Sequence, residues 1–182
     1  MTAWETIVRE HGPLVWHTAY RLLGNRSDAD DCMQETFVAA VAVARRGPVR
    51  NWFALLKKLA VSRGIDFLRR RGRDALRSDD DGQLAQAVSR DASPDVAAQY
   101  VELAMHLRWA LAKLPSRHAE VVCLRYLSEM TYEEISQELQ ISVRHVGVIL
   151  SRAREELREL LKEGGADHGC PKASVGHRGT GL

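Results

Sequence analysis

Apolar residues recur every three or four positions along most of this chain of 182 residues, a spacing that places them on one face of a helix. Aromatic residues make up only 6% of the sequence, and the good helix formers Ala, Leu, Arg and Glu are abundant, so helix is favoured over sheet. The pattern predicts an all-α fold. We expect helices over residues 4–23, about 28–46, 49–71, 94–114, 117–126, 131–139 and 143–162.

Glycine, proline and short polar residues mark the ends of these segments. The run 11–13, His-Gly-Pro, predicts a break or kink within the first helix, because proline lacks a backbone N–H. Ser27 and Ser116 stand where N-cap residues are expected. Pro94 follows Ser93, the order typical of a helix start.

The charge is strongly segregated, although the net charge is only +2. Residues 45–73 hold 10 basic and 1 acidic side chains, whereas residues 74–102 hold 2 basic and 7 acidic ones. A basic block inside a near-neutral chain is typical of a surface that binds a polyanion. A solvated helix face would give the same composition, so charge alone leaves both interpretations open.

Two segments lack the large apolar residues that a core requires. Residues 74–93 are acidic and polar, which predicts a flexible linker. Residues 164–182 contain six glycines and are expected to be disordered. We therefore expect two small helical domains joined by a flexible acidic linker.

Several classes of function are disfavoured. The sequence has no run of about 18 apolar residues and no secretory signal pattern, so we expect a cytoplasmic protein without membrane insertion. Three widely spaced cysteines argue against a disulfide scaffold, and His168, Cys170 and His177 are only a weak suggestion of a metal site. No glycine-rich phosphate loop or catalytic pair is visible. We expect no cofactor, no metal, no small-molecule substrate and no enzymatic activity.

Residues 131–150 have the pattern of a helix-turn-helix. Thr131 and Glu134 form a capping box, and Ser142 is expected to cap the second helix. Gln140 occupies the turn position where glycine is usual, so a left-handed backbone there would carry strain. The expected buried contacts of the motif are Ile135, Leu139, Ile141, Val146 and Ile149.

The second helix of this motif would carry polar and basic residues on its outer faces. In DNA-binding versions such a helix enters the major groove, and cations further along it contact phosphates. An ordinary helical hairpin is the alternative, but it leaves the continuing arginines unexplained. The expected DNA-contacting residues are Arg144, His145, Ser151, Arg152 and Arg154.

Two stretches together resemble one family, the bacterial RNA polymerase sigma factors of the extracytoplasmic-function (ECF, group IV) class. RLLGNRSDADDCMQETFVAAV is similar to sigma region 2, and LAKLPSRHAEVVCLRYLSEMTYEEISQELQISVRHV is similar to sigma region 4. The resemblance covers about residues 4–73 and 98–162. It implies region 2 over residues 1–73, a linker over 74–97, region 4 over 98–163 and a tail over 164–182.

The resemblance implies a function and partners. Such proteins join core RNA polymerase through its β′ clamp helices and β flap, recognise the −10 and −35 promoter elements and help to melt the DNA. They are not enzymes, and an anti-sigma factor often restrains them. The implied polymerase-binding residues are Asp30, Asp31, Gln34 and Glu35. The implied −10 residues are Arg50, Trp52, Lys57, Lys58, Arg63, Arg69, Arg70 and Arg71. The implied −35 residues are Arg144, His145, Ser151, Arg152 and Arg154.

Some positions depart from the family pattern. Trp52 and Phe53 lie among cations, as a site for single-stranded bases requires, but Trp52 could equally be a core residue. The recognition helix has Gly147, Val148 and Ile149 where the family often has Lys, Ser and Arg. Two alternatives therefore stay open. One is a regulator that binds duplex DNA as a dimer without polymerase, and the other is a degenerate sigma relative that binds another protein.

Overall fold

The computed structural model describes residues 3–75 and 94–167, which form helices joined by short turns, without a strand in these ranges. The helices are α1 (Ala3–Leu23), α2 (Arg26–Ala44), α3 (Trp52–Ala75), α4 (Pro94–Lys113), α5 (Ser116–Tyr126), α6 (Tyr132–Leu139) and α7 (Val143–Asp167). The predicted all-α fold is confirmed. We refer to α1–α3 as the N-terminal unit and to α4–α7 as the C-terminal unit.

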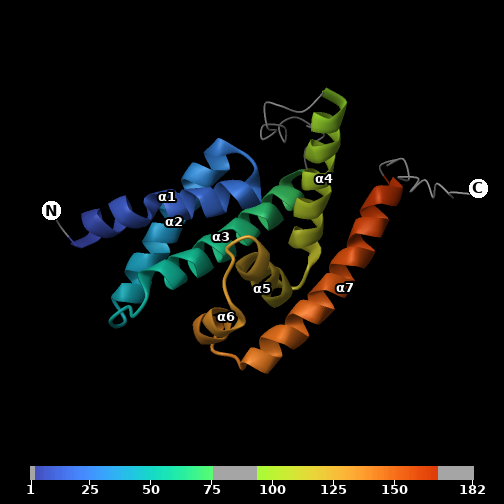
Figure 1. Ribbon diagram of the computed structural model, residues 1–182. Helices are drawn as coiled ribbons and strands as arrows, with labels where there is room; N and C mark the ends of the chain where they lie inside the picture. The colour runs from blue at the N-terminus through green and yellow to red at the C-terminus, as the bar shows by residue number, and fades with distance from the viewer. Residues whose placement is uncertain (1–2, 76–93, 168–182) are drawn as a thin grey trace, which may run out of the picture.

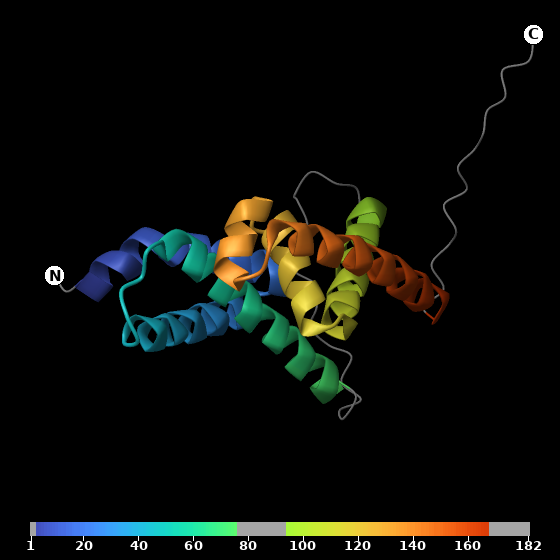
Figure 2. The same cartoon turned by 90° about the horizontal axis from the view of Figure 1, so that it is seen from below.

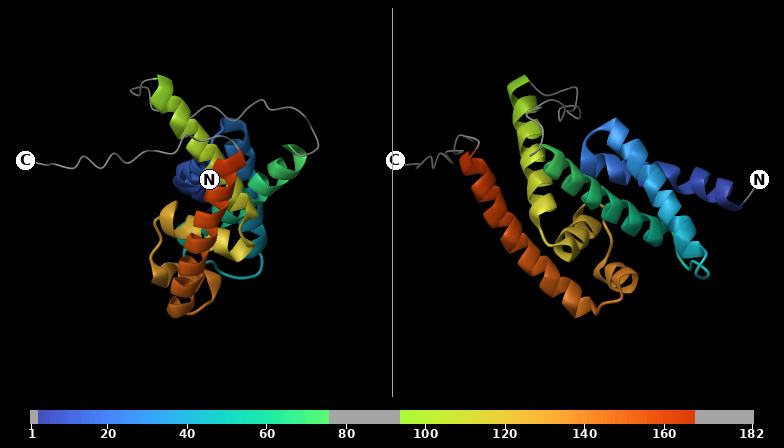
Figure 3. Two further views of the ribbon diagram at one scale, coloured as in Figure 1. Left: turned by 90° about the vertical axis from the view of Figure 1, so that its right-hand side faces the viewer. Right: turned by 180° about the vertical axis from the view of Figure 1, so that it is seen from behind.

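Helix α3 lies at the centre of the molecule (Figure 1). It packs against α1 and α2 on one side and against α4, α5 and α6 on the other. Helix α7 packs on α4, α5 and α6, and it forms the outer edge of the C-terminal unit (Figures 1 and 3). Viewed from below, the two units lie side by side along α3 (Figure 2).

Two apolar clusters stabilise this arrangement. The smaller one lies within the N-terminal unit, where Val15, Ala40, Leu56 and Ala60 are buried. The larger one begins between α1, α2 and α3 and continues without a break through the C-terminal unit. Burying apolar area contributes roughly 25 cal/mol per Å², so the shared cluster favours the docked arrangement of the two units.

Some helix boundaries differ from the sequence-based expectation. Helix α1 continues through Pro13 instead of breaking at residues 11–13, and its packing on α2 and α3 outweighs the one lost backbone bond. Asn25, not Ser27, caps α2, because its side-chain oxygen accepts from the Asp28 N–H at 2.8 Å. Pro115, not Ser116, precedes α5 and provides no side-chain cap.

The ends of the predicted linker and tail are partly helical. Helix α3 runs to Ala75, α4 begins at Pro94, and α7 extends to Asp167. The remaining linker residues, 76–93, and tail residues, 168–182, lie outside the described ranges, as do His168, Cys170 and His177. The predicted flexibility of the linker and disorder of the tail therefore stay predictions.

Candidate functional site

The helix-turn-helix forms as its capping residues predict. The Thr131 hydroxyl accepts from the Glu134 N–H at 3.1 Å, and the Glu134 carboxylate accepts from the Thr131 N–H at 2.7 Å. The Ser142 hydroxyl accepts from the His145 N–H at 3.2 Å at the start of α7. Local side-chain bonds thus fix where each of the two helices begins.

The turn between α6 and α7 contains a left-handed residue at the position where strain was considered. Gln140 adopts φ 53° and ψ 45°, a conformation that costs a non-glycine residue about 1–2 kcal/mol. The strained turn is tied back to α6, since the Ser136 hydroxyl donates to the Ile141 carbonyl at 2.7 Å and the Ile141 N–H donates to the Ser136 carbonyl at 3.1 Å. These bonds hold the angle between the two helices.

Helix α7 has a buried face and an outer face. Its buried face contains Val146, Ile149, Leu150 and Ala153, which pack against α4, α5 and α6. The predicted DNA-contacting residues Arg144, His145, Ser151, Arg152 and Arg154 are all exposed. Val148 is also exposed on the outer face, whereas Ile149 is buried and contributes nothing to it.

Tyr126 is a residue that the sequence analysis missed. Its hydroxyl accepts from the Arg154 Nε at 2.8 Å and also from the Nη2 of the same side chain. The guanidinium also lies over the Tyr126 ring, with 5.6 Å between Cζ and the ring centroid. This hydrogen bond raises the pKa of Arg154 above its ordinary value. No short motif links two residues 28 positions apart, so only the fold brings them together.

Helix α2 carries the predicted polymerase-binding residues, but they do not all face the same way. Asp31 and Gln34 are exposed on the outer side. Asp30 is half-buried and accepts a hydrogen bond from the Trp16 Nε1 at 2.7 Å, so it has a structural partner. Val38, which the sequence analysis did not single out, is 71% exposed and lies one turn beyond Gln34.

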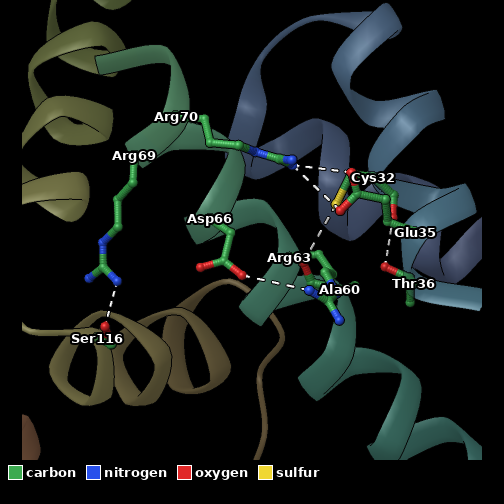
Figure 4. Close-up of polar contacts among 9 residues, drawn as sticks. All are labelled: Cys32, Glu35, Thr36, Ala60, Arg63, Asp66, Arg69, Arg70 and Ser116. Atoms are coloured by element: carbon green, nitrogen blue, oxygen red, sulfur yellow. Dashed lines mark hydrogen bonds and ion pairs between the residues drawn. The ribbon is translucent and has the colours of Figure 1, made fainter. Parts of the chain in front are cut away.

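Three consecutive arginines of α3 have three different partners, as Figure 4 shows for two of them. Arg70 reaches across to Glu35 on α2, with 3.2 Å between Nη2 and Oε1. Arg71 pairs with Asp28 at 2.6 Å. Arg69 points away from both, toward the hydroxyl of Ser116 on α5. Neighbouring helix positions point about 100° apart, so Arg69 faces the C-terminal unit while Arg70 and Arg71 both reach α2.

The other predicted −10 residues differ in whether their charged groups already have a hydrogen-bond or ion-pair partner within the protein. The ammonium groups of Lys57 and Lys58 donate to backbone carbonyls of the C-terminal unit, each at 2.7 Å. Arg63 faces Asp66 at 3.9 Å on the same helix. Arg50 is exposed and has no hydrogen bond or ion pair in the described part of the chain.

The two aromatic residues at the start of α3 have different environments. Trp52 packs on the smaller apolar cluster and meets Trp4 edge-on, with 5.3 Å between ring centroids. Phe53 is 45% exposed, and the Lys57 ammonium lies 4.2 Å from its ring centroid. An exposed ring beside a cation suits base stacking, so Phe53 presents the better stacking surface.

Buried titratable groups in this region are structural. Burial raises the pKa of Cys32 and of Cys123 to about 12 each, and both thiols are buried. The Cys32 thiol donates to the Ala60 carbonyl across the α2–α3 contact at 3.7 Å (Figure 4). Buried, unreactive thiols such as these two pack as small apolar groups.

The pKa of the Arg108 guanidinium is lowered, first by burial and second by the charge of Arg71.

Within residues 3–75 and 94–167, no three His, Cys, Asp or Glu side chains are grouped as metal ligands. None of the helices in the same ranges combines the length and apolar character that a membrane crossing requires.

Comparison with known families supports both halves of the chain. Residues 7–74 match the family described as Sigma-70 region 2, and residues 110–159 match Sigma-70, region 4.

Curated relatives match along most of the chain. The ECF RNA polymerase sigma factor SigE of Mycolicibacterium smegmatis is 32% identical over 88% of the chain, which spans 62% of that relative's length. The RNA polymerase sigma factor CarQ of Myxococcus xanthus is 31% identical, over 88% of this chain and 90% of the relative. The ECF RNA polymerase sigma factor SigW of Bacillus subtilis is 29% identical over the same shares.

Solved structures include a chain with a similar fold. It is the sigma factor RpoE in complex with the anti-sigma factor NepR from Bartonella quintana, with a TM-score of 0.54 and 23% sequence identity. The similarity covers 89% of this chain and 98% of that chain. The arrangement of seven helices in the described ranges therefore has a counterpart among solved structures.

Proposed function

Because the chain belongs to the extracytoplasmic-function sigma factors, we propose that it binds core RNA polymerase and directs transcription initiation at a specific set of promoters. It acts as an initiation factor in the cytoplasm, where the polymerase works, and the chemistry of transcription belongs to the polymerase. One observation carries most weight. The outer face of α7 up to Arg154 is an exposed, cationic surface on a capped helix-turn-helix.

The −35 element is read by this outer face of α7. Arg144 and His145 lie in the first turn, where a recognition helix meets base edges. Ser151 and Arg152 lie two turns further along, where phosphate contacts are expected. A thymine methyl group fits against the exposed Val148 side chain, because apolar contact is how proteins read that group.

The −10 element is held as a single strand by the exposed N-terminal end of α3 and the preceding turn. Arg50 and Lys57 supply charge, and Phe53 supplies a stacking surface between them. Lys58, Arg63 and the arginine run 69–71 are the further cations of α3 that we assign to this element. Lys58 and Arg69 bond to the C-terminal unit, and Arg70 and Arg71 pair with α2. Trp52 acts chiefly by fixing the start of the helix against Trp4.

Core polymerase is bound by the outer face of α2. Asp31, Gln34 and Glu35 offer acidic and polar groups, and Val38, one turn beyond Gln34, adds an exposed apolar side chain. Asp30 contributes indirectly, through its bond to Trp16. The β′ clamp helices are the partner for this face, and the β flap is the partner for the C-terminal unit.

An anti-sigma factor is the further partner that we propose. Helix α4 leaves Tyr100, Leu103 and Leu107 exposed at helical spacing, 61%, 58% and 42% respectively. An apolar stripe of this kind is typical of a helix that a partner protein covers. The structurally similar sigma factor RpoE was solved in complex with an anti-sigma factor.

The experiment that tests the function is transcription with a reconstituted holoenzyme. Purified chain and core polymerase would be used to select fragments from a genomic library, and run-off transcription would be measured on the selected fragments. Promoter-specific transcripts that require the chain are expected. DNA selection by the chain alone, without any gain from polymerase, would instead indicate a stand-alone regulator.

The same assay tests the proposed surface of α7. Arg144→Ala is expected to reduce transcription and relax the preference at a few adjacent base pairs, each base contact being worth about 1–3 kcal/mol. Arg26→Ala is the matched control, since Arg26 is an exposed arginine at the start of α2, outside the proposed DNA surfaces. Equal transcription by both variants would remove Arg144 from the −35 surface.

A further inference from the structure

The first turn of α5 is hydrogen-bonded to the middle of α7. The His118 Nδ1 lies 2.7 Å from the Glu156 Oε2, and because an ionised carboxylate can only accept, the imidazole is the donor. The His118 side chain is only 17% exposed, so water competes for this bond less than it does at an open surface. The bond therefore links the two helices at a defined point.

The other end of α5 is bonded to α7 as well. Tyr126 is the last residue of α5, and its hydroxyl accepts from the Arg154 Nε at 2.8 Å. Arg154 and Glu156 are two positions apart on α7, so their side chains leave the helix in directions about 200° apart. The two bonds thus hold α7 on opposite flanks, one from each end of α5.

The face of α7 between these two flanks is apolar. Ala153 is buried, and Leu157 is partly buried against the larger apolar cluster. Apolar contacts are non-directional, so they hold α7 against its neighbours without fixing the rotation of the helix about its own axis. Hydrogen bonds are directional, and a bond on each flank opposes rotation in either sense.

The rotation of α7 decides which side chains face the DNA and where they lie. Arg144 and His145 extend from the first turn of the same continuous helix, Val143–Asp167. A helix with its side chains has a radius of about 5–6 Å, so a rotation of about 20° moves a side-chain tip by about 2 Å. A shift of that size breaks a hydrogen bond to a base edge.

We propose that His118 and Glu156 are positioning residues that fix the rotation of the recognition helix, with the Tyr126 bond on the other flank, and thereby set the −35 base preference. Neither His118 nor Glu156 belongs to the proposed DNA surface. This inference rests on the proposed reading of the −35 element by α7. It adds that α5 determines part of the specificity without contacting a base.

The test removes each partner of the bond and compares it with a matched variant. H118A deletes the donor, whereas H118N keeps an N–H donor at the same number of bonds from Cβ. E156A deletes the acceptor, and E155A removes the same charge from an exposed neighbour that has no hydrogen bond or ion pair in the described residues. Circular dichroism and thermal unfolding would verify that each full-length variant is folded.

The measured quantity is base discrimination in the −35 element. Holoenzyme made with each variant would select from a library of one promoter, recovered by the genomic selection, in which only the −35 element is randomised. H118A and E156A are each expected to lower discrimination by about threefold to tenfold at the base pairs whose preference Arg144→Ala relaxes, part of the factor that one base contact provides. H118N and E155A should keep the discrimination of the unmodified protein.

The two side chains form one bond, so H118A/E156A should lower discrimination no further than either single variant. If the base ranking stays unchanged in H118A and E156A, whether or not total transcription falls, the pair is merely structural and the proposal is overturned. Full additivity of the two changes, or an equal loss in H118N and H118A, would also overturn it. Failure of the proposed function is seen separately, as absence of promoter transcription by holoenzyme made with the unmodified chain.

Discussion

Arg70 of α3 forms an ion pair with Glu35 of α2, with 3.2 Å between Nη2 and Oε1. The Arg70 guanidinium also lies over the Phe67 ring, 4.2 Å from its centroid, so the side chain is held in one orientation. Glu35 belongs to the proposed polymerase surface and Arg70 to the proposed DNA surface. The ion pair therefore joins the two proposed surfaces.

Glu35→Lys is expected to weaken association with core polymerase, because it replaces an acidic group of the proposed polymerase surface with a cation. Its effect on folding should be small, because both side chains of the pair are nearly half exposed, at 41% and 47%, and such pairs contribute about 0–1 kcal/mol. Equilibrium binding to labelled core polymerase and a thermal unfolding curve would measure the two effects. Glu10→Lys, on the exposed face of α1, is the control. If both variants bind equally well, Glu35 has no part in the polymerase surface.

Tyr126→Phe is expected to weaken −35 binding by releasing the guanidinium of Arg154 while keeping the ring. Arg154→Ala should lower the slope of log affinity against log salt by about one, as the loss of one phosphate contact does. Because Tyr126 acts through Arg154, Arg154→Ala should cost less in the Tyr126→Phe background than in the unmodified protein. Holoenzyme binding to duplex promoter DNA across a salt series gives these values. Fully additive effects would mean that Tyr126 does not position Arg154.

Gly147→Ala is expected to stabilise the protein by about 0.5–1 kcal/mol, because alanine loses less backbone entropy in a helix. A Cβ at residue 147 would meet only the Tyr132 ring, at an ordinary 3.8 Å. Gly64→Ala is the contrasting variant, since its Cβ would lie 2.5 Å from the Leu22 Cδ2 in the α1–α3 contact. Overpacking of that kind costs about 1–3 kcal/mol. Urea unfolding of both variants should show opposite signs, and a loss of stability in Gly147→Ala would contradict the prediction.

Ser128→Ala is expected to raise the free energy of unfolding by about 1–3 kcal/mol, the cost of a buried donor without a partner. The Ser128 hydroxyl is buried and has no hydrogen-bond partner among the described residues, although its backbone carbonyl accepts from Lys57. Alanine keeps the carbonyl and removes only the hydroxyl. Urea unfolding would measure the gain, and Ser62→Ala, a half-buried serine of α3, provides the comparison. An unchanged or lower stability would show that the hydroxyl is satisfied in solution.

Stability is expected to fall in alkaline solution through the two buried thiols. Their pKa values are raised to about 12 in the folded protein from an ordinary 9.0, so the folded state holds these protons more tightly than the unfolded state. The stabilisation is complete below about pH 9 and is lost progressively toward about pH 12. Urea unfolding at about pH 8 and about pH 10 would reveal it, with a smaller pH dependence in C32A/C123A. An equal dependence in that variant would assign the loss to other groups.

The sequence alone determined the features that depend on residues a few positions apart. The helical segments, the capping box at Thr131 and the cap at Ser142 follow from local side-chain and backbone chemistry, although the caps of α2 and α5 and the continuity of α1 did not. The exposed outer face of α7 follows from its apolar period. The resemblance of two stretches to sigma regions 2 and 4 predicted the family, and the matches to both regions confirm it.

Only the tertiary structure decided which hydrogen-bond or ion-pair partner each lysine and arginine side chain has. Arg69, Arg70 and Arg71 read as one basic run, yet Arg69 bonds to the C-terminal unit while Arg70 and Arg71 pair with two different carboxylates of α2. The bond from Arg21 to Leu127 joins positions 106 residues apart, and the bond from Lys57 to Ser128 joins positions 71 apart. A local pattern shows that a cation is present, but the packing of helices determines which carbonyl, carboxylate or ring lies within its reach.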